Sequence, residues 1–243
     1  MDPLAVFVRA ATDLARVAIP VECPGCGTTD VRWCEECACV WWEEPLRCES
    51  LAPRLDIEGR EPMPVWAPAT LGGPAHGFLT AWKDAGRRDL DALLADAMRR
   101  AARGVEVALA DVPASLAVVA VPSRPGAARR RGRDLSALLA RSATAGLAEA
   151  GLEVTRARGV LRLGHGEQRG GSARRRWAGM AGAITAEPLR AGVAAVLTDD
   201  VMTTGATLAA SVRALEGAGT PVVGAIVLAV ADAGRASASS GLG

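Results

Sequence analysis

Two adjacent aspartates, Asp199 and Asp200, follow an apolar run and stand directly before a loop rich in threonine. In an open α/β sheet, ligands bind at the carboxyl ends of the strands. Backbone N–H groups of a loop that opens a helix bind phosphate well. We therefore expect the carboxylates to accept hydrogen bonds from sugar hydroxyls. The expected phosphate-binding residues are Thr203, Thr204, Gly205, Ala206 and Thr207. The alternative is that the two carboxylates only cap a turn before the helix.

A second group of reactive side chains lies near the N-terminus, where all six cysteines fall between residues 23 and 48. Two C-x-x-C pairs are present, formed by Cys23, Cys26, Cys34 and Cys37. Two such pairs complete a tetrahedral sulfur site for a structural Zn²⁺ ion. Disulfides or inert thiols are the alternative, which a cytoplasmic location disfavours. The other two cysteines, Cys39 and Cys48, could each replace one of these ligands or stay free.

Composition excludes several classes of protein. Half of the 243 residues are apolar, which excludes disorder throughout and suffices for one substantial core with a small appendage. The 28 basic and 27 acidic residues nearly cancel, so the net charge gives no general attraction to nucleic acid or membranes. No apolar run approaches the roughly 20 residues that cross a bilayer, and charged residues interrupt the first apolar stretch. We expect a cytoplasmic protein with no signal peptide and no membrane insertion.

Elements that position these residues follow from the apolar pattern. Apolar runs predict strands at 65–71, 116–121 and 222–230, and a strand, loop and helix at 193–217. Helical spacing predicts helices over 75–85, over 90–101 and after residue 134. Repeated strand–helix units predict an α/β fold with a doubly wound, mainly parallel sheet. The expected organisation is an N-terminal helix and cysteine-rich zinc module at 1–50, a linker at 51–64, the main domain at 65–232 and a flexible tail at 233–243.

Taken together, the order of these motifs resembles the ComF family of competence-associated, phosphoribosyltransferase-like proteins over nearly the whole chain. After the double C-x-x-C come Trp-Lys-Asp-Ala-Gly-Arg at 82–87 and Arg-Arg-Gly-Arg-Asp at 130–134. Gln168 and an Arg-Arg-Arg-Trp run at 174–177 precede the acidic pair. The segment 199–207 itself resembles the phosphoribosyl diphosphate (PRPP) signature of type I phosphoribosyltransferases. ComF relatives commonly carry Arg-Gly-Phe-Asn where this chain has Arg-Gly-Arg-Asp at 131–134. This difference leaves the residues of the acceptor pocket unassigned.

This resemblance implies roles for individual residues. Asp199 and Asp200 would hold the ribose 2′- and 3′-hydroxyls as the catalytic pair, the loop 203–207 would hold the 5′-phosphate, and Mg²⁺ would accompany PRPP. The 160s and 170s would form a mobile flap over the diphosphate. Arginine forks suit phosphate oxygens, so the expected diphosphate contacts are Arg130, Arg131, Arg133 and Arg174. For each arginine the alternative is a solvated basic surface.

These expectations combine into a leading interpretation and two alternatives. The leading interpretation is a type I phosphoribosyltransferase-like protein that binds PRPP or a related phosphosugar with a divalent metal, and that could transfer the phosphoribosyl group to an acceptor which the sequence does not identify. Whether it is an enzyme stays open. One alternative is a non-catalytic protein that binds single-stranded DNA or the competence machinery during DNA uptake, although aromatic residues, at 3%, offer few stacking platforms. The other is a regulator that senses PRPP. The oligomeric state is not predicted.

Overall fold

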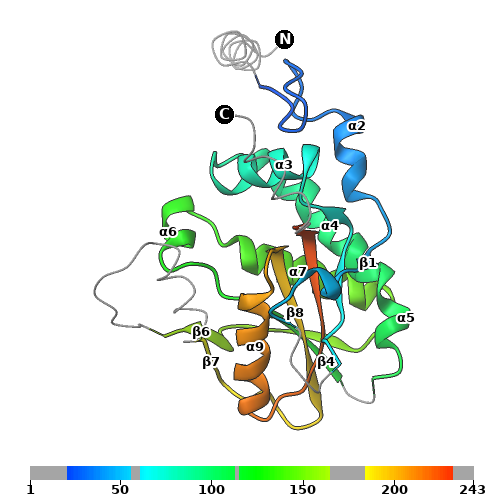
Figure 1. The fold of residues 1–243 in the computed structure, drawn as a ribbon, viewed down its shortest axis with the longest axis vertical. Helices are drawn as coiled ribbons and strands as arrows, with labels where there is room; N and C mark the ends of the chain where they lie inside the picture. Colours follow the sequence, from blue (N-terminus) through cyan, green and yellow to red (C-terminus); the bar gives the residue numbers. More distant parts are fainter. Residues whose placement is uncertain (1–20, 56–60, 113–114, 165–183, 232–243) are drawn as a thin grey trace, which may run out of the picture.

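A mostly parallel sheet forms the centre of the protein in the computed structural model, which describes residues 21–55, 61–112, 115–164 and 184–231 (Figure 1). The strands of this sheet are β1 (Leu46–Arg47), β2 (Val65–Ala67), β3 (Ala69–Thr70), β4 (Ser115–Ala120), β5 (Val154–Ala157), β8 (Val193–Met202) and β9 (Val222–Val230). Within the described residues their order is β1-β2-β9-β8-β4-β5, with β3 also paired to β9. Only β1 runs antiparallel to its neighbour.

Helices cover both faces of this sheet. On one face α3 (Gly73–Lys83), α4 (Asp91–Gly104) and α7 (Leu135–Glu149) pack against strand residues such as Val118 and Val196. On the other face α9 (Ala206–Gly217) packs against Leu197 and Val227. Central strands buried on both faces carry continuous apolar runs, as β8 and β9 do. The protein is therefore a mixed α/β fold with helices on both sides of a mostly parallel sheet.

Shorter elements connect these layers. They are α2 (Glu35–Ala38), η1 (Cys39–Trp41), η2 (Glu49–Leu51), η3 (Arg88–Leu90), α5 (Glu106–Leu109), α6 (Ala127–Arg131), β6 (Leu161–Leu163) and β7 (Ile184–Ala186). β6 and β7 pair antiparallel. β1 joins the sheet through β2, and the Cys48 N–H donates to the carbonyl of Val65 at 2.8 Å. The chain thus enters the sheet ahead of the expected boundary at residue 65. None of the described helices has the length and apolar character needed to span a membrane.

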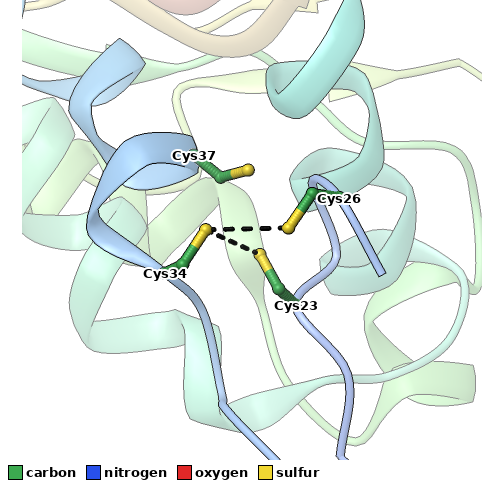
Figure 2. Close-up of side chains that lie close together, drawn as sticks. All are labelled: Cys23, Cys26, Cys34 and Cys37. Carbon is green, nitrogen blue, oxygen red and sulfur yellow. Dashed lines mark hydrogen bonds between the residues drawn. The ribbon is translucent and has the colours of Figure 1, made fainter. Parts of the chain in front are cut away.

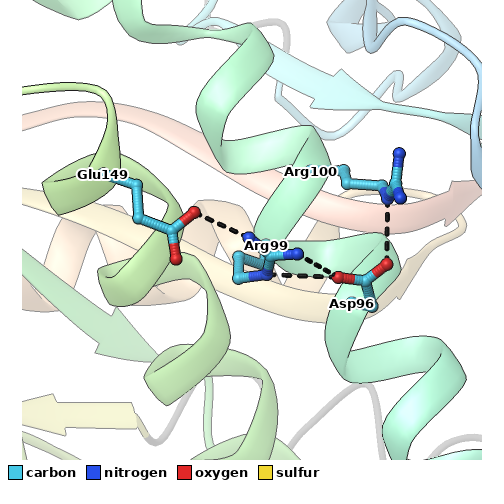
Figure 3. Close-up of polar contacts among 4 residues, drawn as sticks. All are labelled: Asp96, Arg99, Arg100 and Glu149. Carbon is cyan, nitrogen blue, oxygen red and sulfur yellow. Dashed lines mark hydrogen bonds and ion pairs between the residues drawn. The ribbon is translucent and has the colours of Figure 1, made fainter.

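Close packing fixes α7 against α4. A Cβ atom at Gly146 would lie 2.1 Å from the carbonyl oxygen of Arg99, so only glycine allows the two helices to approach this closely. A network of ion pairs and hydrogen bonds also links α4 to α7 (Figure 3). Arg99 bridges Asp96 on its own helix and Glu149 on α7, the latter at 2.7 Å, and Arg100 pairs with Asp96 at 2.9 Å. The position of α7 matters because this helix follows the loop at the end of β4.

Between β4 and β8 the strand order reverses. From β4 the chain crosses through α7 to β5 on one side, whereas β8 lies on the other side of β4. The loops that leave the carboxyl ends of β4 and β8 therefore diverge, and open α/β sheets bind ligands in the crevice formed at such a point. The expected N-terminal helix within 1–20 and the tail at 233–243 lie outside the described residues.

Candidate functional site

The acidic pair lies near the carboxyl end of β8. Asp199 and Asp200 are half-buried, and the Asp200 N–H donates to Oδ1 of Asp199 at 2.8 Å. Burial, reinforced by the negative charge of Asp200, raises the pKa of Asp199 well above its ordinary value. Asp200 Oδ2 lies 2.9 Å from Nζ of Lys83, the last residue of α3. The two carboxyl groups thus differ: one has a raised pKa and the other pairs with an ammonium.

Sequence reasoning missed Lys83. The segment 82–87 served only to mark a family resemblance, with no role given to its lysine. A signal was present, because Lys83 is the only lysine in the chain. What the sequence does not reveal is that α3, more than 100 residues before β8, ends beside the acidic pair.

The loop after β8 leads directly into a helix through a glycine. Gly205 has a φ of +75°, a left-handed conformation that favours glycine, and it stands directly before α9. Thr203 and Thr204 are exposed. The first N–H groups of a helix have no partner within the helix, and they carry partial positive charge toward whatever lies in front of it. This loop can therefore offer hydroxyl and N–H donors to an anion.

Residues 52–55, which precede β2, pack against the loop 203–207. A Cβ atom at Gly205 would lie 2.9 Å from the side chains of Ala52 and Leu55. The Arg54 N–H donates to the carbonyl of Thr204 at 3.1 Å. The expected linker is therefore packed against the candidate phosphate loop over residues 52–55.

A cleft of about 760 Å³ brings most of the predicted residues together. Its lining combines the acidic pair, Lys83 and three threonines with arginines from the segment after β4 that includes α6. The predicted residues in it are Asp199, Asp200, Thr203, Thr207, Arg130 and Arg131. Arg131 is anchored there because its Nε donates to the carbonyl of Lys83 at 2.7 Å. Arg130 is exposed, with Nη1 3.4 Å from the carbonyl of Pro125. Thr204, Gly205 and Ala206 belong to the adjoining loop and are not in the lining.

Two of the predicted arginines lie elsewhere. Arg133 turns toward α3 and α4, where it pairs with Asp91 and donates to the carbonyl of Trp82 at 2.6 Å. Its guanidinium lies over the Trp82 ring, 5.9 Å from the centroid, and its side chain is 10% exposed. Arg133 therefore joins two helices and does not line the cleft. Arg174 lies outside the described residues, as does most of the expected flap, because residues 165–183 are not among those described.

Four cysteines form a compact cluster near the N-terminus of the described chain (Figure 2). The sulfur atoms of Cys23, Cys26, Cys34 and Cys37 all lie within 4.8 Å of one another. Cys34 Sγ is 3.7 Å from both Cys23 Sγ and Cys26 Sγ. Zinc–sulfur bonds of about 2.3 Å in a tetrahedron place sulfurs about 3.8 Å apart. The four side chains could thus hold a metal ion such as zinc.

Protonation states in the cluster are uneven. Burial opposes ionisation of Cys23, but hydrogen bonds from the backbone of Cys34, Gly25 and Cys26 outweigh it and lower the pKa of the Cys23 thiol to about 6. Burial and the neighbouring thiols raise the pKa of Cys37 above its ordinary value. A bound cation favours the thiolate form of every ligand.

The remaining cysteines are separate from the cluster. Cys39 is exposed, and its thiol donates to the carbonyl of Glu36 at 3.1 Å. Cys48 is buried under the sheet, where burial and the charge of Glu49 raise the pKa of its thiol to about 12. Neither residue replaces one of the four predicted ligands.

Helix α3 joins the cysteine cluster to the cleft. A Cβ atom at Gly77 would lie 1.9 Å from the carbonyl oxygen of Pro24, so the cluster backbone touches this helix. Farther along, Phe78 meets Trp41 edge-on with ring centroids 6.0 Å apart. The same helix ends at Lys83 beside Asp200. Packing around the cysteines therefore helps to set the position of the lysine.

Comparison with known proteins does not identify a family for the chain. No model of a known protein family matches the chain, and no curated protein matches it. The resemblance to the ComF family accordingly stays a prediction from the sequence.

Proposed function

We propose that the cleft between the carboxyl ends of β4 and β8 binds PRPP, or a closely related phosphosugar, together with Mg²⁺. The observation that carries the proposal is the adjacency of the acidic pair to the loop 203–207 at the point where the strand order reverses. A sugar phosphate needs hydroxyl acceptors and phosphate donors a few ångströms apart, and this cleft supplies both. In this proposal the chain is a type I phosphoribosyltransferase-like member of the ComF family.

The sugar would be held by the acidic pair. Carboxylates accept strong hydrogen bonds from hydroxyl groups, and Asp199 and Asp200 both line the cleft. Because Lys83 already occupies Oδ2 of Asp200, a ribose hydroxyl either takes another carboxylate oxygen or displaces the ammonium.

The 5′-phosphate and the diphosphate would contact different residues of the cleft. Thr203, Thr207 and the N-terminus of α9 suit the 5′-phosphate, whereas Arg130 and Arg131 suit the diphosphate. Carboxylates of the cleft, including Asp84, offer oxygen ligands to a divalent cation. When bound, Mg²⁺ neutralises charge on the leaving diphosphate.

Transfer to an acceptor would be a displacement at C1 of the ribose. The bond between C1 and the diphosphate oxygen breaks, and its electron pair leaves with the diphosphate. A new bond forms from C1 to the acceptor atom, which loses its proton. Positive charge develops on the sugar during this step, and fixed carboxylates nearby stabilise it.

Packing gives little support to the single-stranded DNA alternative. Of the tryptophans in the described residues, Trp41, Trp66 and Trp82 are buried and Trp33 is half-buried. Trp42 is 41% exposed, and the guanidinium of Arg100 covers its ring at 4.7 Å. Bases need open aromatic faces for stacking.

A PRPP-sensing role would use the same cleft residues as transfer.

Calorimetry tests the proposal directly. Wild-type protein should bind PRPP with Mg²⁺ saturably at one site per chain, and ribose 5-phosphate more weakly because it lacks the diphosphate. Single-stranded oligonucleotide titrated at two salt concentrations tests the alternative, because phosphate contacts produce a steep salt dependence. Folded protein that does not bind PRPP would refute the proposal.

A further inference from the structure

A second cavity lies beyond the loop that follows β4. It measures about 780 Å³ and opens at the carboxyl ends of β4 and β5. Pro122, Ser123 and Arg124 line both this cavity and the cleft, so the loop forms a common wall between them. Neither Asp199 nor any residue of the loop 203–207 lines the second cavity. A ligand in this cavity would therefore contact neither the acidic pair nor the loop 203–207, although the two sites share the wall at 122–124.

Positive charge dominates the walls of this cavity. The arginines in its lining are Arg124, Arg129, Arg141, Arg156 and Arg158. The carboxylate in the lining, Asp134, accepts from the N–H of Ala137 at 2.9 Å and is committed to capping α7. The lining thus carries five arginines and one carboxylate, whose hydrogen bond to the Ala137 N–H caps α7.

Carboxylates neutralise several arginines elsewhere in the described residues. Arg47, Arg87, Arg99, Arg100, Arg133 and Arg162 each form an ion pair with a carboxylate. Across the described ranges, no such ion pair is formed by Arg129, Arg141, Arg156 or Arg158. Like charges that gather in a concave surface and outnumber the carboxylates there raise the local concentration of anions.

The remaining walls define the rest of the ligand. Ser123 Oγ and Ser136 Oγ lie 2.6 Å apart at the cavity and supply hydroxyl groups. Arg156 is half-buried, and its Nη1 lies 3.5 Å from the carbonyl of Ala137, which holds the guanidinium beside the first turn of α7. The buried apolar residues of the lining are Val119, Val121, Ala140, Val160 and Leu161. A ligand that fits must combine an anionic group with an apolar body.

The geometry points to a second ligand site in this cavity, which takes a small organic phosphate with an apolar body. Arginine forks and serine hydroxyls hold the phosphate, and the apolar residues hold the body. The apolar part distinguishes this ligand from PRPP, whose sugar and phosphates are polar throughout. The site does not depend on the proposed function.

Phenyl phosphate is a suitable probe because it has a phosphate and a flat ring but no sugar hydroxyls. We expect saturable binding to the full chain by calorimetry, with inorganic phosphate at least tenfold weaker and phenol without measurable binding. Arg141→Gln combined with Arg158→Gln should weaken phenyl phosphate binding at least tenfold. Both residues are exposed, so the fold should be unaffected. Arg103→Gln with Arg213→Gln is the matched control, since both are exposed helical arginines outside the cavity, and it should change the affinity less than twofold.

A further variant separates the two sites. Thr203→Val with Thr207→Val removes hydroxyls from the cleft and should leave phenyl phosphate binding unchanged. Loss of binding in this variant, with retention in the Arg141 and Arg158 variant, would place the probe in the cleft and overturn the inference. Absence of saturable binding to folded wild-type protein would overturn it as well.

Discussion

Replacing Asp200 with asparagine separates the contribution of the acidic pair to ligand binding from its contribution to the fold. The substitution keeps the size of the side chain but removes the charge that pairs with Lys83 at 2.9 Å. Both side chains are partly exposed, at 21% and 28%, so solvent screens the pair. Exposed ion pairs contribute about 0.2 to 1 kcal/mol, and we expect Asp200→Asn to lower the free energy of unfolding by no more than this.

Its effect on binding should be larger. A hydrogen bond to a charged group contributes about 1.5 to 3 kcal/mol, and each 1.4 kcal/mol corresponds to about a tenfold change in Kd. If a ribose hydroxyl donates to Asp200, Asp200→Asn should raise the Kd for PRPP about ten- to hundredfold. The Kd for pyrophosphate should stay within about twofold, because this ligand has no sugar to reach the acidic pair.

Isothermal titration with PRPP and with pyrophosphate, each in the presence of Mg²⁺, measures both effects. Asp111→Asn is the matched control, because Asp111 is exposed and lies outside the cleft. Thermal unfolding of each variant confirms that the protein is folded. An unchanged Kd for PRPP in folded Asp200→Asn would refute the placement of the sugar. Equal weakening of PRPP and pyrophosphate would show that Asp200 acts on the diphosphate instead.

Three further predictions concern the metal, the loop and the pH dependence of stability. Atomic emission should find about one Zn²⁺ per chain; Cys26→Ser with Cys37→Ser should lose it and Cys39→Ser should retain it, and full zinc in the first variant would show that other residues bind the metal. Gly205→Val should weaken PRPP binding and also lower the melting temperature, because the added Cβ would lie 2.9 Å from Ala52 and Leu55 and the residue has a positive φ; an unchanged protein would contradict the packing of this loop. The fold raises the pKa of Asp199, so the unfolded chain releases this proton first and the group destabilises the fold as the pH rises from about 4 through the raised value. The melting temperature of Asp199→Asn relative to wild type should therefore increase over that pH range, and a decrease would contradict the direction of the shift.

Apolar patterning was sufficient to predict the centre of the sheet. The strand predicted at 222–230 has those bounds in the structure, and the strand predicted at 116–121 is shifted by one residue. Each lies inside the sheet and is apolar on both faces, so its signal does not depend on a partner. The apolar run 65–71 was predicted as one strand but forms two short ones, β2 and β3, which both pair with β9.

Pairing partners explain what the sequence could not reveal. The sequence places the acidic pair directly before the loop, but β8 continues to Met202 because Val201 and Met202 remain paired with β9. Residues 46–47 lack an apolar run and form β1 only because β2 is available. The placement of Lys83 and the inward turn of Arg133 likewise depend on how α3 meets distant elements. Local patterns picked out residues that the fold brings together in the cleft, whereas the contacts that orient them are long-range.

The pairing of β2 with β9 also determines when the protein can fold during its synthesis. Trp66 lies opposite Ile226, about 160 residues later in the chain, and ribosomes add about 5 to 20 residues per second. The first strands must therefore wait about 10 to 30 s for their partner. The four cysteines lie within 15 consecutive residues and need no such partner. Their cluster can thus capture a metal ion while the rest of the chain is still emerging, and α3 can dock on a module that has already formed.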